Sequence, residues 1–68
     1  MPTDWKTPLA AALRETDPAK IPNACERARL AIHGRLFELV RERPADLGER
    51  EQLDEAMRRL FLHENRPL

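Results

Sequence analysis

The sequence has few of the residues that form disulfide bonds and phosphate-binding loops in small domains. It has a single cysteine in 68 residues, so no disulfide can form within the chain. Its two glycines stand apart, which excludes a glycine-rich phosphate loop. The aromatic residues are one tryptophan and two phenylalanines, with no tyrosine. So few aromatic and β-branched side chains leave little material for a β-sheet or for stacking on nucleic-acid bases.

An excess of either charge is also absent. Twelve basic residues balance twelve acidic ones, whereas nucleic-acid-binding domains usually present a net basic face. The longest unbroken apolar run is Leu9–Leu13, and a membrane-spanning helix needs about 18 apolar residues. Residues 1–8 include Asp4 and Lys6 and lack the apolar centre of a signal peptide. We therefore expect a cytoplasmic protein that binds neither nucleic acid nor a membrane.

The residues that are abundant favour helices. Ten leucines and nine alanines stand against one valine and two isoleucines, and leucine, alanine, glutamate and arginine are all strong helix formers. Prolines and capping residues predict a short helix at about 8–15 behind a Thr7 cap, a main helix at about 22–43 and a last helix at about 47–64. Asp17 is expected to cap a single turn before the main helix, and Asp46 to cap the last one.

These elements predict one all-α domain over residues 1–68. The short connection after the main helix predicts an antiparallel helical hairpin. The N-terminal helix would lie across one end of the hairpin or along one side of it. Trp5 is the largest apolar side chain of that segment, and we expect it to fix the N-terminus to the hairpin.

The main helix carries two apolar stripes at helical spacing. Projected at about 100° per residue, the first stripe contains Ile21, Cys25, Ala28, Ile32, Leu36 and Leu39. The second stripe, whose centre lies roughly 120° away, contains Leu30, His33, Phe37 and Val40. The last helix has one stripe of its own, formed by Leu53, Ala56, Met57, Leu60, Phe61 and the stem of Glu64. That stripe can cover only one of the two on the main helix.

The second stripe therefore predicts a second copy of the chain. An N-terminal helix of about two turns is too short to cover a main helix on the order of 30 Å long. A domain of this size also buries only about 60% of its unfolded surface and is marginal alone. We expect a homodimeric four-helix bundle about a two-fold axis, with Leu30, His33, Phe37 and Val40 as the candidate interface. A helical surface of another protein is the alternative partner.

No catalytic, cofactor or metal site is predicted. Cys25, His33 and His63 are the only cysteine and histidines, and none is paired at the i,i+3 or i,i+4 spacing of helical metal ligands. We interpret His33 as an interfacial residue bonded to a carboxylate, with a phosphoacceptor role as the alternative. Cys25 is interpreted as a small core residue rather than a redox group, and His63 as a cation at a helix C-terminus.

Two arginines flank the first stripe. Helical mutases use arginines inside bundles to hold dicarboxylates, so Arg29 and Arg35 indicate a small-molecule site as an alternative. We prefer a structural interpretation, in which Arg35 pairs with a glutamate of the opposing helix, Glu49 or Glu64. No second cluster of convergent polar residues accompanies these arginines in the sequence.

The chain resembles a group of small bacterial helical proteins without an assigned biochemical role. The resemblance covers most of the chain. It is carried by the pattern Glu15-Thr16-Asp17-Pro18, then Lys20, then Ala31-Ile32, Arg35-Leu36 and Glu38-Leu39, with a tryptophan near the start. It implies a helical scaffold and transfers no catalytic residue. The leading hypothesis is a non-enzymatic homodimeric adaptor or regulatory protein. The alternative is a small helical-bundle enzyme or phosphotransfer module that uses His33 and neighbouring arginines.

Overall fold

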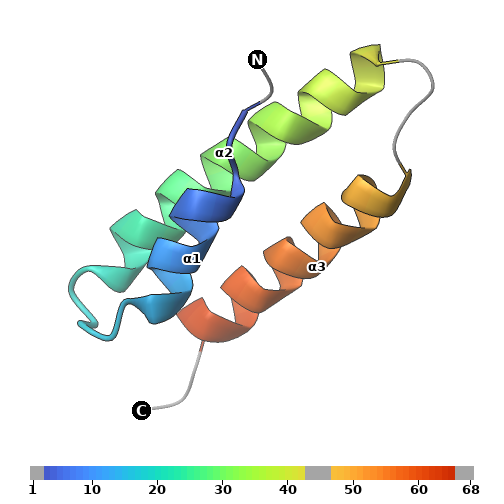
Figure 1. Ribbon diagram of the computed structural model, residues 1–68. Helices are drawn as coiled ribbons and strands as arrows, with labels where there is room; N and C mark the ends of the chain where they lie inside the picture. The colour runs from blue at the N-terminus through green and yellow to red at the C-terminus, as the bar shows by residue number, and fades with distance from the viewer. Residues whose placement is uncertain (1–2, 43–46, 66–68) are drawn as a thin grey trace.

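The computed structural model describes residues 3–42 and 47–65, which form three packed helices without a strand (Figure 1). Helix α1 spans Lys6–Arg14, α2 spans Ile21–Arg41 and α3 spans Leu47–Glu64. The all-α prediction is confirmed, as are the short first helix and the two long ones that follow it. None of the described helices is long and apolar enough to cross a membrane.

Helix α1 begins earlier than the sequence predicted. The expected start was Pro8 behind a Thr7 cap, but the carboxylate of Asp4 accepts hydrogen bonds from the backbone N–H groups of Lys6 (3.1 Å) and Thr7 (3.2 Å). These bonds satisfy two of the orphan donors at the helix start, and hydrogen bonds from Thr7 and Lys6 lower the pKa of Asp4. Pro8 then lies inside the first turn, where its missing N–H costs nothing. The helix ends at Arg14, one residue before the predicted end.

The connection from α1 to α2 follows the prediction. The carboxylate of Asp17 accepts a hydrogen bond from the backbone N–H of Ala19 (2.9 Å), and its carbonyl accepts one from Lys20 (2.8 Å). Helix α2 begins one residue earlier than expected, at Ile21, and Pro22 lies in its first turn.

The end of α2 differs from the prediction. The helix stops at Arg41 rather than Arg43, because Glu42 already has extended backbone angles (φ −78°, ψ 145°). The sequence predicts a turn at residues 45–48, but Leu47 and Gly48 already belong to α3. Residues 45–46, with the predicted Asp46 cap, lie outside the described part of the chain.

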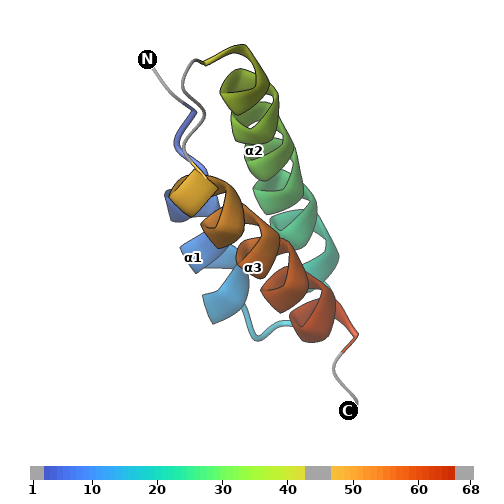
Figure 2. The same cartoon turned by 90° about the vertical axis from the view of Figure 1, so that its right-hand side faces the viewer.

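The three helices pack side by side in alternating directions. Helix α1 runs antiparallel to α2 and parallel to α3, along one side of the α2–α3 hairpin (Figures 1 and 2). The first stripe of α2 and most of the stripe of α3 face this shared centre, as predicted. Phe61 and Glu64 are the exceptions, because both residues are exposed. The buried core consists of Trp5, Ala12, Cys25, Ala28, Ile32, Leu39, Leu53, Ala56 and Leu60.

Candidate functional site

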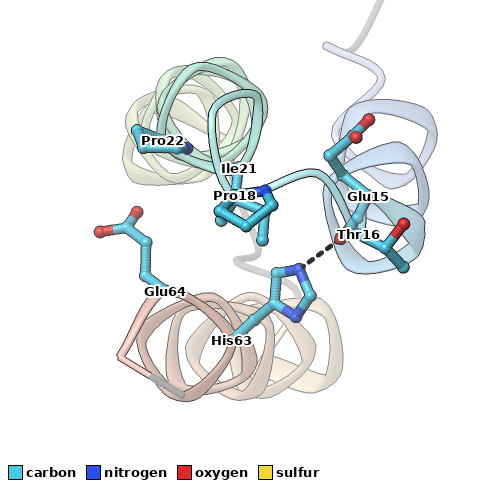
Figure 3. A pocket seen from close by; sticks show the side chains of 7 residues that line it. All are labelled: Glu15, Thr16, Pro18, Ile21, Pro22, His63 and Glu64. Carbon is cyan, nitrogen blue, oxygen red and sulfur yellow. Dashed lines mark hydrogen bonds between the residues drawn. The ribbon is translucent and has the colours of Figure 1, made fainter. Parts of the chain in front are cut away.

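The second stripe of α2 lies on the outside of the molecule. Leu30 and Phe37 are each 63% exposed and Val40 is 82% exposed, and His33 between them is exposed as well. We call Leu30, His33, Phe37 and Val40 the outer stripe. In the end-on view of Figure 3, α1 and α3 both lie to one side of α2. The far side of α2 has no neighbour among the described residues.

The position of α1 explains why the outer stripe stays open. The N-terminal segment packs on a different sector of α2, where a Cβ added at Gly34 would lie 3.7 Å from the Oγ1 atom of Thr3. Projected at about 100° per residue, Gly34 and the core-facing first stripe lie on the two sides of α2 that α1 and α3 cover. The outer stripe lies on neither of these sides. The prediction that the short helix cannot cover the second stripe therefore agrees with the observed packing.

Charged residues stand at both ends of the outer stripe, and the sequence analysis did not single them out. At the N-terminal end, the carboxylate of Glu26 lies 3.3 Å from a guanidinium nitrogen of Arg29. At the C-terminal end, the guanidinium carbon of Arg41 lies 4.8 Å from the centroid of the Phe37 ring, a cation–π geometry. An acidic residue that is paired with Arg29 therefore precedes the outer stripe, and a basic residue follows it.

The outer stripe offers little support for chemistry at His33. The expected hydrogen bond from its ring to a carboxylate is not made within the described part of the chain. Arg35 lies two residues further along α2 and so points to a different side of the helix. Arg29 shares a side with His33, but its guanidinium group binds Glu26 (3.3 Å) and Glu64 (2.7 Å).

A part-buried polar cluster surrounds Arg35, which is itself 7% exposed. Its Nη2 and Nε atoms donate to the two carboxylate oxygens of Glu49 at 2.9 and 2.5 Å, so the pair is bidentate. The indole Nε1 of Trp5 donates to the same carboxylate (3.1 Å). Arg35 therefore pairs with Glu49, one of the two partners expected, and Trp5 fixes the N-terminal segment to α3 as predicted.

The cluster continues along α2 toward the chain start. Arg35 also donates through Nη1 to Glu42 (2.9 Å) and Glu38 (3.2 Å). The second carboxylate oxygen of Glu38 accepts a hydrogen bond from the hydroxyl of Thr3 (2.6 Å). All three nitrogens of the Arg35 guanidinium group are thus bonded to protein carboxylates. The cluster joins the N-terminal segment, α2 and α3, and it does not present its guanidinium group to a ligand.

The charges in this cluster shift the pKa values of its members. Hydrogen bonds from Arg35, and then from Trp5, lower the pKa of Glu49 to about 2. Hydrogen bonds from Thr3 lower the pKa of Glu38, and the bonds to Glu49 raise the pKa of Arg35. Both shifted carboxylates are therefore ionised over the physiological pH range, as a permanent structural contact requires.

The other end of the bundle contains a hollow of about 350 Å³ (Figure 3). It is lined by Glu15, Thr16, Pro18, Ile21, Pro22, His63 and Glu64. The Nε2 atom of His63 lies 3.1 Å from the carbonyl oxygen of Glu15, which joins the last turn of α3 to the end of α1. This contact is additional to the helix-dipole interaction expected for His63.

Cys25 lies in the core, as expected. Burial, and next the charge of Glu64, raise the pKa of its thiol, which disfavours the reactive thiolate. Within residues 3–42 and 47–65, no three His, Cys, Asp or Glu side chains come together in an arrangement that could hold a metal ion.

Comparison with models of known protein families, with curated proteins and with solved structures found no match. The described residues form a helical hairpin braced by a short third helix. The outer stripe of α2 is exposed, and so are Leu47, Phe61 and Leu62 of α3. Function is inferred from the outer stripe and from the charges beside it.

Proposed function

We propose that the protein is a non-enzymatic interaction module that forms a homodimer through the outer stripe of α2. The supporting observation is the exposure of Leu30, Phe37 and Val40, at 63%, 63% and 82%, in one row at helical spacing. Single exposed apolar residues are common on protein surfaces. A contiguous apolar row is typical of an interaction site.

A second copy fits this surface for reasons of size and symmetry. A stable interface of ordinary size buries roughly 800 Å² on each partner, which is about 15% of the 5357 Å² surface of this chain. An interface about a two-fold axis uses the same patch on both partners. A single apolar stripe is therefore sufficient. In such a dimer α1 and α3 of each copy lie on the side of α2 that faces away from the partner, so the two hairpins are joined through α2 rather than around one shared four-helix core.

The dimer leaves the charged side of α3 available to other molecules. Glu55, Arg58 and Arg59 form only long, exposed ion pairs there, at 3.7 and 3.8 Å, and such pairs stabilise a helix weakly. We propose a cytoplasmic adaptor or regulatory role for the dimer. The arginines suggested for small-molecule binding are bonded to glutamates, which favours this role over a small helical-bundle enzyme.

Sedimentation equilibrium from about 5 to about 500 µM tests the dimer. Leu30→Glu should abolish association, because it places a charge in the middle of the apolar contact. Leu62→Glu is the matched control, because Leu62 of α3 is 62% exposed, against 63% for Leu30, and lies outside the outer stripe. Circular dichroism checks that both variants keep their helices. A wild-type chain that stays monomeric throughout the concentration range, or equal loss of association in both variants, would contradict the proposal.

A further inference from the structure

Two apolar residues of the outer stripe, Leu30 and Phe37, share one midpoint along α2 with two flanking charges of opposite sign, Glu26 and Arg41. Glu26 stands four residues before Leu30, and Arg41 stands four residues after Phe37. The midpoint between Leu30 and Phe37 is also the midpoint between Glu26 and Arg41, and it falls between His33 and Gly34. A helix with this pattern is complementary to an antiparallel copy of itself.

We infer that two copies of the chain pair α2 against α2 in antiparallel orientation, about a two-fold axis between His33 and Gly34. Glu26 then faces the partner's Arg41, Leu30 faces the partner's Phe37, and each contact occurs twice. The other two residues of the outer stripe, His33 and Val40, lie opposite the partner's Gly34 and Arg27. This inference rests on the proposed homodimer and adds its orientation and register.

Charge selects the antiparallel orientation. A parallel pair about a two-fold axis would place Glu26 beside the partner's Glu26 and Arg41 beside the partner's Arg41, and like charges in contact oppose association. The antiparallel pair replaces both repulsive contacts with attractive ones. It also places the N-terminus of each α2 near the C-terminus of the other, which is the favourable arrangement of two helix dipoles.

Charge also selects the register. An axis at Arg35 is the midpoint of the four residues of the outer stripe and would pair Leu30 with the partner's Val40. It would also bring Arg41 opposite the partner's Arg29, which again places like charges together. With the axis between His33 and Gly34, the Glu26 carboxylate is free to turn toward the partner, because its side chain is 60% exposed and its bond to Arg29 is long at 3.3 Å. Arg41 is already held over the Phe37 ring at the edge of the same surface.

Charge reversal at the two positions tests this arrangement. The variants are Glu26→Arg, Arg41→Glu and the double variant with both changes. The control is Arg58→Glu, a charge reversal at an exposed position on α3. Association of each variant, and of an equimolar mixture of the two single variants, is measured by sedimentation equilibrium. Circular dichroism again checks folding.

Each single reversal should weaken the homodimer about tenfold or more, equivalent to about 1.4 kcal/mol, because two attractive contacts become repulsive. The double variant should recover most of the wild-type affinity. The mixture of single variants should form a mixed dimer, because each chain then meets opposite charges at both positions. Arg58→Glu should associate like the wild type.

Three results would overturn the inference. The single reversals could associate as tightly as the wild type, or the mixture could fail to recover association. Alternatively, wild type mixed with Glu26→Arg could form a tighter dimer than wild type alone, which indicates a parallel pair. In each case a wild-type dimer that Leu30→Glu disrupts would leave the proposed function standing. A wild-type chain that stays monomeric would contradict both the proposed homodimer and its antiparallel arrangement.

Discussion

Replacing Glu49 with glutamine removes the charge at the centre of the cluster that joins Trp5, Arg35 and α3, and the folded state should lose stability. The side chain keeps its length and one carbonyl oxygen, but its amide group turns a donor toward the Arg35 guanidinium. Glu49 accepts bonds from Arg35 at 2.9 and 2.5 Å and from the indole of Trp5 at 3.1 Å. The loss is therefore electrostatic, with little change in packing volume.

The magnitude follows from the pKa of Glu49, which falls from 4.5 to about 2 in the folded chain. A shift of this size corresponds to at most about 3.5 kcal/mol, at about 1.4 kcal/mol per pKa unit. Solvent reaches 21% of the Glu49 side chain, and Arg35 keeps two other carboxylates. We therefore expect a loss of about 1 to 2 kcal/mol at pH 7, or about 5 to 15 °C in melting temperature for a domain of this size.

The sign of the pH dependence provides the check. The pKa of Glu49 is lowered on folding, so its contribution is complete above about pH 4.5 and is lost as pH falls toward 2. Urea unfolding followed by the fluorescence of Trp5, the only tryptophan, should show a gap between wild type and Glu49→Gln that is widest at pH 7 and narrows below pH 4.5. Glu51→Gln, an exposed position on the same helix, is the control. A gap below about 0.5 kcal/mol at pH 7, or one of equal size at pH 7 and pH 2.5, would refute the reasoning.

Three further predictions concern packing. Gly34→Ala should raise stability by about 0.5 to 1 kcal/mol in a thermal melt, because the added Cβ would meet Thr3 at an ordinary 3.7 Å; a lower melting temperature would contradict this. Ile32→Ala should lower the free energy of unfolding by about 2 to 5 kcal/mol in urea, because Ile32 is fully buried. Val40→Ala at low micromolar concentration should change it little, because Val40 is 82% exposed. Similar losses in both variants would contradict the core assignment. The thiol of Cys25 should react with a thiol reagent only as fast as the chain opens, so that urea accelerates labelling; fast labelling of the folded chain would show that the thiol is accessible.

The helices and their core face were predictable because hydrophobic spacing reports which side of a helix is covered. The first stripe of α2 and Leu53 and Leu60 of α3 lie in the core as that spacing indicates. The start of α1 was not predicted, because two residue types that favour helix starts compete there. The Asp4 carboxylate caps the helix ahead of Thr7, and the Thr7-Pro8 pair alone gives no sign of this.

The candidate site was also predictable only in part. The second apolar stripe of the main helix was the reason to expect a second copy. The spacing of Leu30, Phe37 and Val40 in the sequence was enough to find that stripe, and all three residues are exposed in the structure. The charges that fix the proposed orientation, Glu26 and Arg41, were missed, because charged residues occur all along this chain. Their symmetric placement about the stripe was visible in the sequence and is the signal that would have found them.

Helix α1 is fastened to α3 at both ends, by the bond from Trp5 to Glu49 near the first turn and by the contact of Glu15 with His63 near the last. A terminal helix of nine residues ordinarily frays, and its amide protons then exchange with solvent long before the rest of the domain opens. Here α1 can open only by releasing both of its attachments. The amides of Ala12 and its neighbours should therefore exchange at the rate of the whole molecule, so that the chain opens as one cooperative unit rather than from its first helix inward.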